Sequence, residues 1–165
     1  LDKSTGGAHP FPDVNSWGFS QHAPFKAVYE HDQRSVYLMV QRQHKHPFLS
    51  LFDGSDPNAS TPQRVNTTVP TQALYMLNSP FFHRQCEDFA RRLYREYPTD
   101  QARLAGAYEM AFGRLPAATE VTGAQRFLRR YRAQLADTGG EAGELRLWSA
   151  YARILLASNE FLYID

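Results

Sequence analysis

Hydrophobic positions follow a helical period in the second half of the chain and no regular period in its first fifth. From Phe82 onward, apolar side chains recur at steps of three or four residues, which places them on one face of an α-helix. In residues 1–33, glycines and prolines interrupt every periodic run. The pattern therefore predicts an irregular arm at 1–33, followed by a mainly helical chain.

Four consecutive helices are predicted between residues 79 and 158. The first, which ends at Pro98, carries its apolar face on Phe82, Cys86, Phe89, Leu93 and Tyr97. Along its outer side, charges four residues apart predict the pairs Glu87/Arg91 and Asp88/Arg92. The other three helices are expected at about 99–113, 118–136 and 143–158. The short turns between them predict mostly antiparallel neighbours.

Residues 34–78 have a weaker pattern. The apolar run at 34–43 fits a short helix or a buried strand. A long polar connection follows at 44–70, and the apolar island at 48–52 indicates that this loop is packed. Pro70 suits the first turn of a helix, which puts three apolar residues on one side: Ala73, Leu74 and Leu77.

The predicted fold is mainly α, with the irregular arm and a long ordered loop packed on an antiparallel bundle of about four to five helices. We expect three parts along the chain. They are the arm at 1–33, a segment at 34–78 with the polar loop and the first bundle helix, and a helical bundle at 79–165. The last two parts are expected to form one domain.

Composition narrows the possible functions. The chain has 165 residues with 42% hydrophobic and 21% charged side chains, and a net charge of +1 argues against nucleic acid as a partner. No apolar run approaches the roughly 20 residues of a membrane-spanning helix. A single cysteine, Cys86, excludes an internal disulfide and the two-cysteine motif that attaches c-type haem, so no cofactor is expected within these residues.

Polar groups that could support chemistry are concentrated between residues 51 and 72. One interpretation is a cleft of a hydrolase-like or redox enzyme, completed by residues further upstream. Its candidate catalytic side chains are Asp53, Asp56, Arg64 and Thr71 or Gln72. The favoured alternative is structural, with the aspartates forming Asx turns and Arg64 bridging one of them.

Two other binding interpretations concern the same half of the chain. Asp56, Asn58 and Ser60 alternate as in a calcium loop, but the Gly and Glu that complete that motif are missing. Trp17 and Phe19 either pin the arm onto the domain or stack on sugar rings, as in a carbohydrate-binding module for polysaccharides.

A basic surface is predicted on the helix expected at 118–136. It carries four arginines: Arg126, Arg129, Arg130 and Arg132. We favour a solvated helix face over a contact with an acidic partner or a sulfated or phosphorylated polymer, because acidic residues nearby dilute the charge.

Three blocks of sequence together resemble a known family. They are residues 34–42 with 46–56, residues 67–80, and the motif at 111–116 with the ending at 159–165. In order and spacing they resemble the planctomycete cytochrome-c-associated domain, domain of unknown function 1553. Within the first block, Arg34, Arg42 and His46 are candidate binding residues.

The resemblance implies a large exported, periplasmic protein of which this chain is the C-terminal portion, with a c-type haem segment upstream. It also implies a part in electron transfer or in handling polysaccharides, without known catalytic residues. One departure from the family pattern is Ala117, which stands where a capping threonine is usual, so we expect Thr119 to start that helix instead.

Our first hypothesis is a non-catalytic module that docks against the remainder of its own chain or a protein partner. Its contact surface would be the 44–72 loop and the aromatic arm. The enzyme and the carbohydrate-binding module remain the alternatives.

Overall fold

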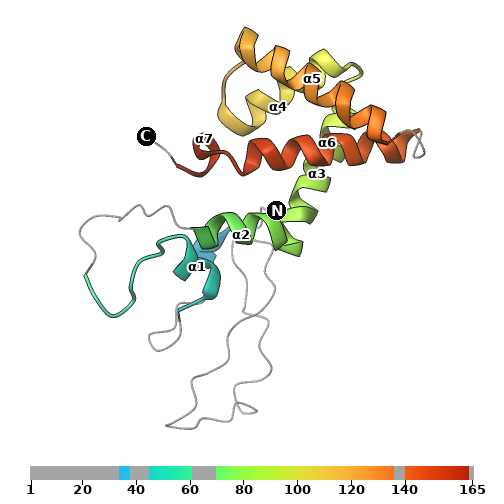
Figure 1. The fold of residues 1–165 in the computed structure, drawn as a ribbon. Helices are drawn as coiled ribbons and strands as arrows, with labels where there is room; N and C mark the ends of the chain where they lie inside the picture. Colours follow the sequence, from blue (N-terminus) through green and yellow to red (C-terminus); the bar gives the residue numbers. More distant parts are fainter. Residues whose placement is uncertain (1–33, 38–44, 61–69, 136–139, 164–165) are drawn as a thin grey trace. The chain divides into compact units, whose positions relative to one another are not determined.

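The computed structural model describes residues 34–37, 45–60, 70–135 and 140–163. These ranges form a 3-10 turn and seven α-helices, with no strand among them (Figure 1). The predicted mainly-α fold is confirmed. The chain divides into two compact units, Leu1–Gln72 and Ala73–Asp165. The division expected at residues 33 and 78 stays a prediction.

The first unit contains two short helical elements in its described part. The turn η2 (Ser35–Tyr37) is a single 3-10 turn whose Val36 is 78% exposed, so this part of the 34–43 run is neither an α-helix nor a buried strand. The apolar island forms helix α1 (Pro47–Leu51), which begins with a proline at its first turn. The rings of Phe48 and Phe52 lie 4.9 Å apart and are half-buried, so the island is partly packed. The packing of the whole 44–70 loop stays a prediction.

The second unit is built around the helices α3 (Pro80–Glu96) and α6 (Glu141–Leu156), which cross each other (Figure 1). The hydroxyl of Ser79 accepts the backbone N–H of Phe82 and starts α3. Its predicted apolar face is confirmed, with the largest burial at Phe82, Cys86 and Leu93. The buried residues of α6 lie on more than one face of the helix, because α3, α4 and α5 all pack against it.

The helices α4 (Asp100–Phe112) and α5 (Ala118–Gln134) complete the core. Five of their side chains belong to the same buried cluster as Trp148 of α6: Leu104, Ala107, Tyr108, Ala124 and Leu128. The hydroxyl of Thr99 accepts the N–H of Ala102 and caps the start of α4. Gly113 ends α4 at φ 70°, a left-handed conformation that favours glycine. The last helix, α7, spans Asn159–Leu162.

Two local expectations in this unit are wrong. The N-cap of α5 is Ala117 and not Thr119, because the carboxylate of Glu120 accepts the N–H of Ala117 at 2.6 Å and holds the helix start in place. The second is the pair Asp88/Arg92 on α3. Asp88 pairs with Arg91 at 2.7 Å, and Arg92 binds Glu96 one turn further on. The predicted pair Glu87/Arg91 is confirmed at 3.6 Å.

The helix α2 (Pro70–Asn78) has the predicted apolar side, but that side faces solvent. Leu74 is 54% exposed and Leu77 is 69% exposed. The covered side carries Gln72, which is 5% exposed, and Met76, which packs against the cluster around Phe82. No helix in the described ranges is long and apolar enough to cross a membrane.

Candidate functional site

The loop after α1 uses its acidic groups to build turns. An oxygen of the Asp56 carboxylate accepts the N–H of Asn58 at 2.9 Å, which is the Asx turn predicted for this position. Asp53 lies at φ 53°, in the left-handed region that aspartate tolerates better than most residues. The ammonium of Lys45 donates to the carbonyl of Gly54 and closes the loop. These contacts favour the structural interpretation of the loop.

Three more of the described candidates in the first unit have local partners. The imidazole Nδ1 of His46 accepts the N–H of Phe48 and caps α1. The side chain of Gln72 donates to the carbonyl of Leu51 at 2.9 Å, and this bond explains why a glutamine occupies a buried position. Arg34 donates to the hydroxyl of Tyr37 at 3.3 Å. The Gln72 bond joins the first turn of α2 to the last residue of α1, whereas the other two contacts are local. None of these contacts assembles a catalytic set.

Several predicted residues cannot be placed in a site. Arg42, Arg64, Trp17 and Phe19 lie outside the described residues. Thr71 and Ser60 are exposed. Across the described ranges, no three His, Cys, Asp or Glu side chains are close enough to hold a metal ion. The calcium loop, the Arg64 bridge and the sugar-stacking surface therefore stay predictions.

Cys86 is a core residue. It is 0% exposed and packs beside Phe82 and Ala152. Burial raises the pKa of its thiol to about 11, so the reactive thiolate is scarce at neutral pH. Its burial agrees with its predicted place on the apolar face of this helix.

Arg132, predicted as part of a solvated face, instead joins three helices in the second unit. Its guanidinium binds the carboxylate of Asp100 at 2.6 Å, at the start of α4, and that of Glu144 at 2.6 Å, near the start of α6. Hydrogen bonds from Arg132 hold the pKa of the Asp100 carboxyl below its usual range. Acidic groups also gain from the positive end of each helix dipole.

Arg114 makes a similar junction at the other end of α5. It binds Glu120 at 2.8 Å and Glu160 of α7 at 2.7 Å, and its guanidinium lies 5.4 Å from the ring of Tyr108. Hydrogen bonds from Arg114, helped by the N–H of Ala117, lower the pKa of the Glu120 carboxyl to about 2. The motif at 111–116 therefore has a structural role in the bundle.

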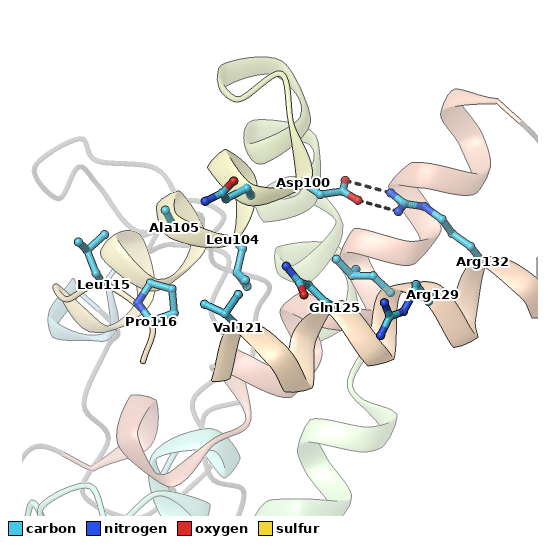
Figure 2. A pocket seen from close by; sticks show the side chains of 11 residues that line it. Asp100, Leu104, Ala105, Leu115, Pro116, Val121, Gln125, Arg129 and Arg132 are labelled. Atoms are coloured by element: carbon cyan, nitrogen blue, oxygen red, sulfur yellow. Dashed lines mark hydrogen bonds and ion pairs between the residues drawn. The ribbon is translucent and has the colours of Figure 1, made fainter. Parts of the chain in front are cut away.

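A groove of about 600 Å³ lies between α4 and α5 (Figure 2). Most of its length is apolar, lined by Leu104, Ala105, Leu115, Pro116, Val121 and Leu128. The end of the groove away from Leu115 is polar. The ion pair between Asp100 and Arg132 lies at this end (Figure 2). The volume falls within the roughly 300–1,000 Å³ of typical ligand sites.

This groove is missing from the sequence-based prediction. A helical period indicates which side chains point inward, such as Leu104 and Leu128, but it does not show where two helices leave a groove between them. The sequence feature that could have indicated the groove is the apolar pair Leu115 and Pro116, in a short turn that needs no apolar residues. Leu115 is 62% exposed at the edge of the groove.

The family model PSD1, described as a protein of unknown function (DUF1553), matches residues 1–128. The matched range reaches into α5 and leaves α6 outside. Comparison with curated proteins found no match, and comparison with solved structures found none either.

Proposed function

This chain belongs to the DUF1553 family of proteins of unknown function, and we propose that it acts as a non-catalytic helical docking module. Its proposed partner is a preceding segment of the same polypeptide. That polypeptide would be a large exported protein of the planctomycete type with a c-type haem segment upstream, as the sequence resemblance implies. The 44–72 loop and the arm would add further contacts.

The outer side of α2 is the observation that carries this proposal. Leu74 and Leu77, one helical turn apart, are 54% and 69% exposed. Covering apolar surface stabilises a complex by about 25 cal/mol per Å², and contiguous exposed apolar side chains commonly mark interaction sites. A preceding segment that covers these two leucines would gain that free energy.

The polar groups of the first unit support a non-catalytic function. Asp56, His46 and Gln72 cap or link local backbone groups, and each has a described partner. The enzyme alternative, whether hydrolase or redox, would need these same groups to act on a substrate. The carbohydrate-binding alternative depends on Trp17 and Phe19, which lie outside the described ranges.

The test is a binding measurement in trans. The segment encoded directly upstream is produced separately, and its affinity for the 165-residue chain is measured by calorimetry. The double substitution Leu74→Ser/Leu77→Ser is expected to weaken binding at least about tenfold, because each buried leucine contributes roughly 1.5–3 kcal/mol and 1.4 kcal/mol is a factor of ten.

A matched control is Leu115→Ser, since Leu115 is 62% exposed but lies in the α4–α5 turn. This variant should bind the upstream segment as the unchanged chain does. An equal loss in the control, or an upstream segment that does not bind the chain, would reject the docking proposal.

A further inference from the structure

The polar end of the α4–α5 groove carries a second arginine, Arg129, beside Arg132. Arg132 is occupied by Asp100 and Glu144, but Arg129 makes no hydrogen bond or ion pair within the described part of the chain. Arg129 lines the groove and is exposed. It is therefore a positive group at the groove that remains able to bind an anion.

The acidic group at this end is already neutralised. Both oxygens of Asp100 accept hydrogen bonds from Arg132, at 2.6 and 3.0 Å, and this pairing keeps the carboxyl ionised and engaged. A cationic ligand would have to break these bonds, whereas an anion would meet the unpaired guanidinium of Arg129. Charge complementarity at the groove consequently favours a negatively charged head group.

The rest of the groove is apolar, so the whole site has one polar and one apolar end (Figure 2). We propose that it binds a small amphipathic carboxylate. The apolar tail would lie along Leu104, Val121 and Leu128, and the carboxylate would pair with Arg129. The amide of Gln125, which also lines the groove, can donate a further hydrogen bond to the head group.

This site is separate from the docking side of α2. It is formed by other helices and by other side chains, and it needs no partner segment. The groove can therefore bind its ligand even if the docking proposal fails, and the docking proposal does not depend on the groove.

The test uses sodium decanoate as the probe, below its micelle-forming concentration, in an amide-resolved NMR titration of the 165-residue chain. Saturable shifts are expected at the groove-lining residues of α4 and α5. Decyltrimethylammonium has a tail of similar length and a positively charged head group, and it is expected to bind at least about fivefold more weakly. The substitution Arg129→Gln should weaken decanoate binding about threefold to fivefold, as for an exposed ion pair.

Arg126→Gln is the matched control, because Arg126 is an exposed arginine of the same helix that does not line the groove. It should leave decanoate affinity unchanged. Ala105→Phe places a ring in the groove and should abolish the saturable shifts. If that variant is not folded by circular dichroism, Leu115→Ser replaces it and should weaken binding about threefold.

Four results would overturn the proposal: no saturable shifts in the groove, shifts confined to α2, equal losses in Arg129→Gln and Arg126→Gln, or equal affinity for the cationic amphiphile.

Discussion

Arg114 and Arg132 each hold two carboxylates that come from separate segments of the chain. Arg132 binds Asp100 and Glu144, which are 32 and 12 residues away, while Arg114 binds Glu160 at a separation of 46 residues. Neighbouring charges in the sequence could predict pairs within one helix only. These longer pairings depend on how α4, α5, α6 and α7 pack, so the sequence pattern could not indicate them.

The Arg114 junction predicts a pH dependence of stability. The Glu120 carboxyl has a pKa of about 2 in the folded chain, below the roughly 4.3 of an unfolded glutamate. Its contribution is therefore complete above about pH 4.5 and is lost as the pH falls toward 2. Urea unfolding between pH 5 and 2.5 should show a smaller loss of unfolding free energy for Arg114→Gln than for the unchanged chain. Parallel curves for the two proteins would contradict this assignment.

Cys86 predicts slow thiol chemistry. Raising the thiol pKa from 9.0 to about 11 lowers the thiolate fraction at pH 8 about 100-fold, and burial blocks access as well. Reaction with a chromogenic disulfide reagent should thus be at least about 100-fold slower in the native chain than in guanidinium. A native thiol that reacts at the unfolded rate would show that the α3 face is not packed as described.

At the scale of elements, helix positions and most caps could be predicted from the sequence, because Ser79, Thr99 and Gly113 act through local backbone contacts. The sequence could not predict which side of a weakly amphipathic helix is buried. In α2, a glutamine is buried and two leucines are exposed, since the hydrogen bond from Gln72 to Leu51 satisfies the polar group. In the candidate site, the role of Asp56 in a turn could be predicted from the sequence. The groove could not, because it forms only where α4 and α5 pack side by side.

The contact between α3 and α4 gives a prediction for Gly106. A Cβ at this position would lie 2.4 Å from the ring of Tyr97, so the ring would have to move out of its packed position. Gly106→Ala should lower the unfolding free energy by about 1–2 kcal/mol. In a Tyr97→Ala background the same change should be neutral or stabilise the helix by up to about 1 kcal/mol, because alanine favours helix more than glycine. Thermal and urea unfolding of the four proteins measure this double-mutant cycle, and equal effects in both backgrounds would refute the contact.

At the scale of the whole molecule, the central claim is that α2 is an interface within a longer polypeptide. The buried core belongs to α3, α4, α5 and α6, and that core does not use the outer side of α2. A covering segment would account for two exposed leucines on adjacent turns. Under this proposal the outer side of α2 would be buried in the assembled protein, and the bundle would support it.

Thiol labelling at position 77 tests this claim most directly, because Cys86 is buried and gives little background. Leu77→Cys and the control Leu115→Cys are each introduced into the 165-residue chain and into the complete polypeptide of its reading frame, and labelling is followed by peptide-resolved mass spectrometry. We expect Cys at 77 to react at least about tenfold more slowly in the complete polypeptide, and Cys at 115 to react at the same rate in both. Equal rates at 77 in the two proteins, or a reading frame that encodes no residues beyond these 165, would contradict the docking module.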